Sequence, residues 1–196
     1  MKKKMINSKL KYITAAMSTA MLLCACSGKT KTPVVTTSGN EVSLNAVSVS
    51  INNVRYTDIE FEVPEKFVPS EDNSEVSAMY ASPLSTDHSY ISYNRKIVSP
   101  DDDYSIFTTE DMQEALKSLS ANTAVSDFSN EYYEEDEYRR IKAEVVIRPE
   151  SGEYHMTEYI YITDNFVFTL IYMLDTGAEE GWSAEFEKSM EGIELK

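Results

Sequence analysis

Apolar and polar residues alternate along the C-terminal half of the chain, and this alternation predicts three long β-strands joined by short turns. The strands span residues 139–148, 154–163 and 166–174. The first two have a continuous apolar face, whereas the third is apolar on both faces, as is typical of a central strand covered on two sides. Asp164 and Asn165 are expected to form a tight turn with positive φ. The pattern therefore predicts an antiparallel meander.

The half of the chain before this meander predicts shorter strands. Alternating apolar residues indicate strands near residues 47–51, 59–63, 76–80 and 91–97, and Pro64 ends the second of them. The globular part of the chain is therefore expected to begin at the first of these strands.

Two helices are predicted from apolar residues spaced three or four positions apart. The first can be capped by Thr108 or Thr109 and ends before Asn122. The second follows the meander and ends at Gly192, beyond which the chain can form a last edge strand. The apolar stripe of the first helix contains Met112, Ala115, Leu116 and Leu119, and that of the second contains Trp182, Phe186 and Met190. Helices and strands together indicate an α+β fold.

The order of these elements resembles the PsbP-like family, which includes extrinsic photosystem subunits and bacterial lipoproteins. The resemblance covers roughly residues 56–195. It rests on an early strand running into a proline (Phe61 to Pro64), a mid-chain helix, the long-strand meander and the closing pattern from Trp182 to Met190. It implies an antiparallel sheet sandwiched by helices, an α-β-α sandwich, with non-catalytic binding or assembly roles. Residues 47–196 are accordingly expected to form one PsbP-like domain.

The N-terminus has the features of an export leader. Five lysines within the first 11 residues precede a mildly apolar stretch from Tyr12 to Leu23, and no acidic residue occurs before Glu41. This stretch is shorter than the ~20 residues of a membrane-spanning helix. The run from Leu23 to Cys26 resembles the lipobox of bacterial lipoproteins, with an aliphatic residue at −3 and a small residue at −1. Residues 1–25 are therefore predicted to be a lipoprotein signal peptide.

Two cysteines could receive the lipid, and the residue before each distinguishes them. Cys24 follows Leu23, which is bulky for a signal peptidase, whereas Cys26 follows Ala25. Cys26 is therefore the expected attachment site. The resemblance implies a diacylglyceryl group there, whose two acyl chains anchor a protein stably to a bilayer, at the outer side of the bacterial cell membrane. The alternative is an ordinary secretory leader that leaves Cys26 as a free thiol.

The segment after the leader indicates how far the domain can lie from the membrane, and the net charge indicates which kinds of partner it can bind. Residues 26–46 contain the lipidated cysteine and a tether rich in Ser, Thr, Gly, Lys and Asn, with an r.m.s. span of about 25 Å if flexible. Removal of the leader takes away five lysines and changes the formal net charge from −15 to −20. Such a charge argues against nucleic acid as a partner and against close contact with an anionic bilayer. A basic protein partner or a cation fits it better.

One acidic segment interleaves tyrosines with carboxylates, a composition found in binding surfaces. It is the candidate surface for a basic protein partner. The alternative is a helix-to-strand connection whose tyrosines pack inward while the carboxylates face water. The candidate residues are Tyr132, Tyr133, Glu134, Glu135, Glu137 and Tyr138.

Motifs of catalysis and metal binding are missing from the sequence. His88 and His155 are the only histidines, and exposed or partly packed positions are expected for them. The Asp101–Asp103 run lacks the glycine of a calcium loop, because no glycine occurs between Asn40 and Gly152. No nucleophile elbow, phosphate loop or dinucleotide fingerprint occurs. We therefore expect a protein that is not an enzyme and needs no cofactor or metal.

Two other functions remain open alternatives to a partner-binding module. They are a small-ligand or cation-binding lipoprotein serving a transporter, and a carboxylate-dependent hydrolase. A cleft between sheet and C-terminal helix, with convergent carboxylates of shifted pKa, favours the hydrolase. An exposed aromatic patch favours partner binding.

Overall fold

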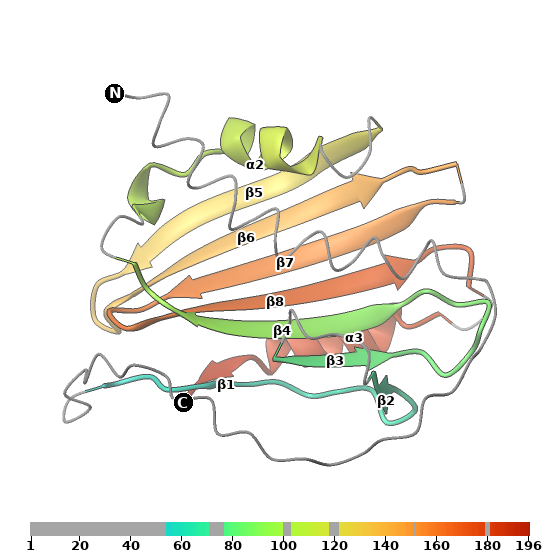
Figure 1. Ribbon diagram of the computed structural model, residues 1–196, viewed down its shortest axis with the longest axis horizontal. Helices are drawn as coiled ribbons and strands as arrows, with labels where there is room; N and C mark the ends of the chain where they lie inside the picture. The colour runs from blue at the N-terminus through green and yellow to red at the C-terminus, as the bar shows by residue number, and fades with distance from the viewer. Residues whose placement is uncertain (1–53, 71–76, 100–102, 118–121, 151, 179–180) are drawn as a thin grey trace, which may run out of the picture.

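A computed structural model describes residues 54–70, 77–99, 103–117, 122–150, 152–178 and 181–196. These residues form a seven-stranded antiparallel sheet of order β2-β3-β4-β8-β7-β6-β5 and a separate two-stranded sheet of β1 and β9 (Figure 1). The strands are β1 (Ile59–Glu60), β2 (Val68–Pro69), β3 (Ala78–Ala81), β4 (Tyr90–Ile97), β5 (Thr123–Tyr133), β6 (Tyr138–Ile147), β7 (Tyr154–Ile162), β8 (Phe166–Asp175) and β9 (Glu194–Leu195). The helices are a 3-10 turn η2 (Tyr104–Ile106), α2 (Thr109–Leu116) and α3 (Ser183–Glu191).

The predicted meander is confirmed as strands β6, β7 and β8. Arg140 lies opposite Tyr161, and Tyr161 lies opposite Phe168, so the three strands pair in register over most of their length. Strand β8 is also paired with β4 and is buried on both faces, as its continuous apolar sequence predicts. The strand expected near residues 47–51 lies outside the described residues.

The two helices pack on opposite faces of the sheet and make the molecule an α-β-α sandwich. Met112 and Leu116 of α2 are fully buried in a core with Ile141 and Val145 of β6. Trp182 and Phe186 belong to a second core on the other face with Ile91, Leu170 and Tyr172. The view in Figure 1 has α3 behind the sheet. The predicted antiparallel α+β sandwich is therefore confirmed.

Helix α2 begins where the sequence predicts and also protects an edge of the sheet. Thr108 caps it in a reciprocal box, accepting from the Asp111 N–H at 3.2 Å and donating its own N–H to Asp111 Oδ2 at 2.9 Å. The side-chain amide of Gln113 then bonds the carbonyl of Thr123 and the N–H of Val125. Because β5 is an edge strand, these two bonds occupy backbone groups that could pair with another chain. Leu119 lies outside the described residues.

The short β1–β9 sheet covers one end of the α3 face. Ile59 pairs with Leu195, and Thr57 and Asp58 donate their N–H groups to the Lys196 carbonyl. Ile59, Phe168 and Tyr161 form a third buried cluster beneath this pair of strands. The chain therefore enters and leaves the described domain at the end where the β5–β6 and β7–β8 turns lie, at the left of Figure 1. No helix among the described residues is long and apolar enough to cross a membrane.

Two local predictions are wrong. Strand β5 was not expected, and its register shifts between Val125 and Asp127, where a bulge interrupts the alternation of apolar residues. The expected positive φ at Asp164 and Asn165 is not found, because among the described non-glycine residues only Glu137 has one, at 56°. Bonds from the Thr163 N–H and hydroxyl to the Phe166 carbonyl close the β7–β8 connection, so Asp164 and Asn165 do form the predicted two-residue turn, but without positive φ.

Candidate functional site

The β5–β6 hairpin carries the segment that the sequence marks as a partner surface. Strand β5 ends at Tyr133 and β6 begins at Tyr138, and these two residues face each other across the strands. Residues 134–137 form the turn, with Glu137 in the left-handed region. The helix-to-strand connection considered from the sequence is therefore wrong. We call residues 132–138 the hairpin tip.

The tip divides its three tyrosines between the two faces of the hairpin. Tyr133 and Tyr138 are half-buried, and their rings stack with centroids 4.8 Å apart. Tyr138 also meets the ring of Tyr56 edge to face. Tyr132 points to the opposite face because side chains alternate along a strand, and it is 57% exposed beneath the guanidinium of Arg139. Tyr132 is therefore the aromatic contact that the tip offers to solvent, and the other two tyrosines pack inward.

Arg55 binds the turn at its outer side and fixes its shape. Its guanidinium donates to the Glu135 carbonyl at 3.0 Å and to Asp136 Oδ1 at 3.2 Å, and lies 3.6 Å from Glu137 Oε2. Glu134 and Glu135 are exposed. The turn carries four acidic residues and is braced by Arg55, while Arg139 and Arg140 lie over the rings of Tyr132 and Tyr133.

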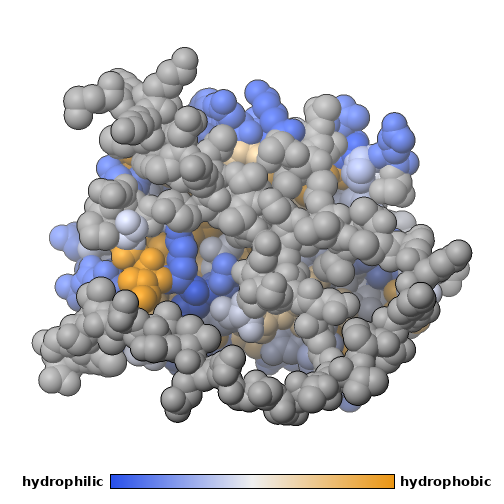
Figure 2. All heavy atoms as spheres, in the orientation of Figure 1, coloured by the Kyte–Doolittle hydropathy of each residue, from blue (hydrophilic) through white to orange (hydrophobic). Residues whose placement is uncertain are grey.

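Exposed apolar side chains occur at the same end of the sheet. Ile97, the last residue of β4, is 68% exposed, and Ile106 in η2 is 54% exposed. Asn130 of β5 donates to the carbonyls of Tyr104 and Phe107, which holds η2 close to the hairpin. In the space-filling view, apolar atoms reach the surface at the left of the molecule, and hydrophilic residues line its upper rim (Figure 2).

A row of aromatic rings extends from the tip along the α3 face of the sheet. Ring centroids are 5.9 Å apart for Tyr138 and Tyr161, 6.2 Å for Tyr161 and Tyr159, and 6.5 Å for Tyr159 and Tyr172. Phe186 of α3 follows at 5.5 Å. Burial raises the pKa of Tyr159, Tyr161 and Tyr172, so their phenols stay neutral at physiological pH. The row makes a stiff connection between the tip and α3.

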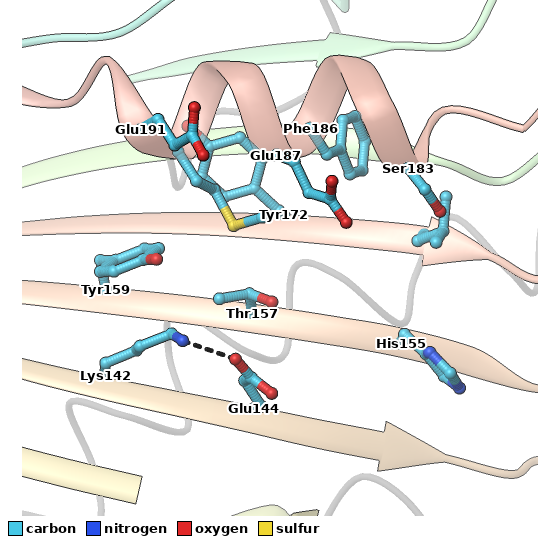
Figure 3. A pocket seen from close by; sticks show the side chains of 12 residues that line it. Lys142, Glu144, His155, Thr157, Tyr159, Tyr172, Ser183, Phe186, Glu187 and Glu191 are labelled. Atoms are coloured by element: carbon cyan, nitrogen blue, oxygen red, sulfur yellow. Dashed lines mark hydrogen bonds and ion pairs between the residues drawn. The ribbon is translucent and has the colours of Figure 1, made fainter. Parts of the chain in front are cut away.

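This row leads into a groove of about 470 Å³ beside α3 (Figure 3). Thr157 and Tyr159 of β7 form its floor with Tyr172 of β8. Helix α3 forms one bank and β6 the other (Figure 3). The bank residues are Ser183, Phe186, Glu187, Met190 and Glu191 on α3, and Lys142 and Glu144 on β6.

The charged groups of the groove lie on both banks. On β6 the Lys142 ammonium contacts Glu144 Oε1 at 2.5 Å, and this bond raises the pKa of Lys142. On α3, Glu187 and Glu191 are exposed and both line the groove, and Glu187 points toward the sheet (Figure 3). Carboxylates therefore outnumber the single ammonium along the groove.

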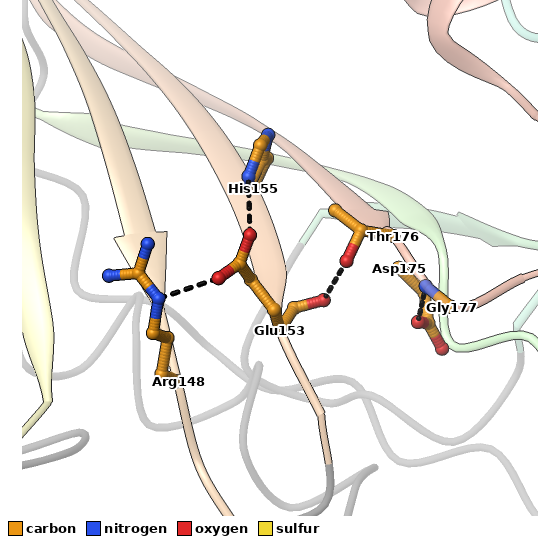
Figure 4. Close-up of polar contacts among 6 residues, drawn as sticks. All are labelled: Arg148, Glu153, His155, Asp175, Thr176 and Gly177. Carbon is orange, nitrogen blue, oxygen red and sulfur yellow. Dashed lines mark hydrogen bonds and ion pairs between the residues drawn. The ribbon is translucent and has the colours of Figure 1, made fainter.

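A polar cluster closes the end of the groove near the β6–β7 turn (Figure 4). Glu153 accepts from Arg148 Nε at 2.6 Å and lies 3.2 Å from His155 Nε2, and these bonds lower the pKa of Glu153. The Glu153 carbonyl accepts from the Thr176 hydroxyl. His155 is exposed, as the sequence predicts, and is positioned by a carboxylate.

A fully buried acid on the other face of the same strand was not identified from the sequence. Glu158 is 1% exposed and lies between Ala143 and Ile171 on the face that packs against α2. Its Oε2 has no hydrogen-bond partner among the described residues. Burial raises the pKa of this carboxyl to about 7. The sequence does contain an indication of this burial, because Glu158 lies between Met156 and Ile160 on the predicted apolar face of the strand.

Neither the predicted metal candidates nor the buried acid forms a site with the groove among the described residues. These residues contain no group of three or more His, Cys, Asp or Glu side chains placed to hold a metal ion. Asp103 instead caps η2 through the Ser105 N–H. Glu158, the carboxyl whose pKa is raised most, lies on the α2 face of the sheet and not in the groove on the α3 face. The ionisable side chains that line the groove are Lys142, Glu144, His155, Glu187 and Glu191.

Comparisons with known proteins support the fold and leave the function open. No known protein family and no curated protein matches the chain. Among solved structures, the cyanobacterial PsbP (CyanoP) of Synechocystis sp. PCC 6803 matches with a TM-score of 0.51 and 10% identity, over 70% of this chain and 86% of that one. The chain therefore has a PsbP-like fold.

Two other solved structures are less similar. LpqN of Mycobacterium tuberculosis, described as involved in cell envelope biogenesis, has a TM-score of 0.49 and 11% identity over 74% of this chain and 87% of its own. A protein of Bacteroides thetaiotaomicron has a TM-score of 0.40 and 14% identity, over 70% of this chain and 45% of that one.

Proposed function

We propose that this protein is a membrane-anchored, non-catalytic module that binds a basic protein partner outside the cytoplasm. The observation that carries the proposal is the hairpin tip, where Tyr132 is 57% exposed beside exposed Glu134 and Glu135. A large aromatic side chain with a charged rim is the arrangement that dominates binding energy in protein interfaces. Because Arg55 and the Tyr133–Tyr138 stack already fix the tip, little conformational entropy is lost on binding.

The place of the tip in the domain agrees with an anchor at Cys26. The first described residues, Val54 and Arg55, lie at the tip, because Arg55 binds the turn directly. The predicted tether ends at residue 46 and has an r.m.s. span of about 25 Å if it is flexible. The anchored end of the domain is thus the end that presents the tip to proteins at the membrane surface.

The anchor has a direct chemical test. Cells expressing the chain with radiolabelled palmitate are expected to label it, and the Cys26→Ser variant is expected to stay unlabelled. Globomycin, which blocks the lipoprotein signal peptidase, is expected to leave a longer precursor. The Cys24→Ser variant is the matched control and should be labelled like the wild type. Equal labelling of the Cys26→Ser variant would contradict the assignment.

Charge reversal at the tip is expected to abolish capture of the partner. In the double variant Glu134→Lys, Glu135→Lys, two carboxylates on the rim become ammonium groups, and like charges across an interface cost several kcal/mol. Glu137 is left unchanged because it lies near Arg55 and has positive φ. Affinity capture from cells after crosslinking, followed by mass spectrometry, measures the effect.

A matched control distinguishes an effect of the hairpin tip from an effect of the change in net charge. The double variant Glu110→Lys, Glu114→Lys changes the net charge equally on α2, where both residues are exposed. This control should retain the partner, and Tyr132→Ala should lose most of it. Thermal melts should show every variant folded, with a slightly lower midpoint for the α2 control because Glu110 lies in the first turn of that helix. Equal recovery with the tip variants and the α2 control would refute the proposed contact.

A further inference from the structure

We propose that the groove beside α3 binds an extended segment of the partner that carries lysine or arginine side chains. This inference rests on the proposed function and adds a second contact to it. Tyr132 points to the α2 face of the sheet and the groove lies on the α3 face, so one partner would reach both contacts by passing around the edge strand β5. The hairpin tip would provide the exposed aromatic contact, and the groove would select for positive charge.

The charge of the groove fits a cationic occupant. Glu144 lies on the β6 bank, and Glu187 and Glu191 lie on the α3 bank, opposite a single ammonium from Lys142. That ammonium is bound to Glu144 at 2.5 Å and is not positioned to neutralise the glutamates on the helix. The nearest basic residue of α3, Lys188, pairs instead with Glu62 on the other side of the helix. The α3 bank therefore presents two carboxylates without an ion pair among the described residues.

The floor of the groove fits the apolar stem of a long basic side chain. Tyr159 and Tyr172 form it with the small residue Thr157 (Figure 3), and Leu174 and Met190 add apolar side chains to the lining of the groove. Lysine and arginine place their methylene stems on such surfaces while the charged end reaches carboxylates or water. A volume of about 470 Å³ lies within the range of ligand sites and accommodates more than one side chain.

The bank formed by α3 is fixed before any ligand arrives. At its N-terminus Trp182 donates to Asp87 Oδ2 at 2.5 Å and packs against Phe67. Near its C-terminus the Ser189 hydroxyl lies 2.8 Å from the Tyr172 hydroxyl and also bonds the Glu62 carbonyl. A preformed groove binds without the entropic cost of ordering its walls.

A labelled peptide tests this groove without knowledge of the partner. The probe is a fluorescein-labelled peptide of alternating lysine and leucine, and fluorescence anisotropy measures its binding to the full chain in mild detergent. The double variant Glu187→Gln, Glu191→Gln should weaken binding about fivefold, as expected for the loss of two exposed ion pairs. Thr157→Trp should weaken it at least as much by filling the floor without a change of charge. The double variant Glu110→Gln, Glu114→Gln on α2 should bind as the wild type does.

Two results would overturn the proposal that the groove binds a basic peptide segment. Wild-type affinity in both groove variants would overturn it, and so would equal competition by spermidine and by unlabelled peptide, which would indicate a site for free cations. The tip variant Glu134→Lys, Glu135→Lys should keep its affinity for the peptide at 0.15 M salt, where charges more than about 8 Å apart are screened. Loss of partner capture in the tip variant alone would therefore support the proposed function independently of the groove.

Discussion

Replacing Glu158 with methionine is expected to raise the free energy of unfolding at pH 8 by about 3 kcal/mol. Glu158 is 1% exposed in a central strand, and Oε2 has no hydrogen-bond partner among the described residues. Its cross-strand neighbours, Ala143 and Ile171, are apolar. Burial without compensation raises the pKa of the carboxyl from 4.5 to about 7. Methionine has a similar length and leaves no polar atom to desolvate.

The increase in the free energy of unfolding caused by Glu158→Met is expected to grow as the pH rises. Between pH 4.5 and pH 7 the folded protein keeps a proton on Glu158 that the unfolded chain has released. The stability contributed by this group therefore decreases as pH rises through that window and stays low above it. Glu158→Met removes the titration, so its advantage over the wild type should be small at pH 5 and reach its full size near pH 8.

Urea denaturation at pH 5, 6, 7 and 8 measures this difference. Glu114→Met on the exposed surface of α2 is the matched control and should change stability little at every pH. A Glu158→Met protein that is less stable than the wild type at pH 8, or a difference that does not change with pH, would show that the carboxyl has a stabilising partner.

Replacing Asp87 with alanine is expected to lower the free energy of unfolding by about 3 kcal/mol. Asp87 is buried and accepts from the Trp182 indole N–H at 2.5 Å and from the Ser89 N–H at 2.9 Å. Its removal leaves these donors without their acceptor, and each such loss costs about 1–3 kcal/mol. Trp182 begins α3 and packs against Phe67, so loss of this bond should loosen one bank of the groove.

The acid dependence of this site has the opposite sign to that of Glu158. Burial raises the pKa of Asp87, but the hydrogen bonds from Ser82, Ser89 and Trp182 outweigh it and hold the pKa below 3.8. The stabilisation is therefore complete above the ordinary pKa of an aspartate and is lost as pH falls through the lowered value. Asp87→Asn keeps one acceptor oxygen and should lose only about 1 kcal/mol.

Urea titrations followed by tryptophan fluorescence measure both Asp87 variants. Trp182 is the chain's single tryptophan, so the signal reports on this site alone. Equal stability of Asp87→Ala, Asp87→Asn and the wild type would mean that this bond does not hold α3.

The parts of the fold that follow a simple period were predictable from the sequence. Strands β6 and β7 alternate without interruption, β8 is a continuous apolar run, and Trp182 and Phe186 mark the buried side of α3. Strand β5 was missed because its bulge at Val125 and Asp127 moves the side chains to opposite faces midway. The sequence of β5 alone does not reveal this bulge, because a bulge is defined by how the strand pairs with its neighbour β6.

The candidate site was predictable only where it is local in sequence. The hairpin tip lies within one short segment, and its composition marked it, although the division between Tyr132 outside and Tyr133 inside needed the strand register. The groove joins Glu144 to Glu187, which are far apart in the chain. Its existence depends on where α3 crosses the sheet, and no sequence pattern specifies that position.

Site-specific crosslinking in living cells tests the central claim most directly. A photo-crosslinking amino acid is placed at Tyr132 in the hairpin tip, or at Glu110 on α2 as the control, and adducts are identified by mass spectrometry. We expect one discrete adduct with a basic protein from position 132, none from position 110, and loss of the adduct in the double variant Glu134→Lys, Glu135→Lys. No adduct from position 132, or the same adducts from both positions, would contradict it.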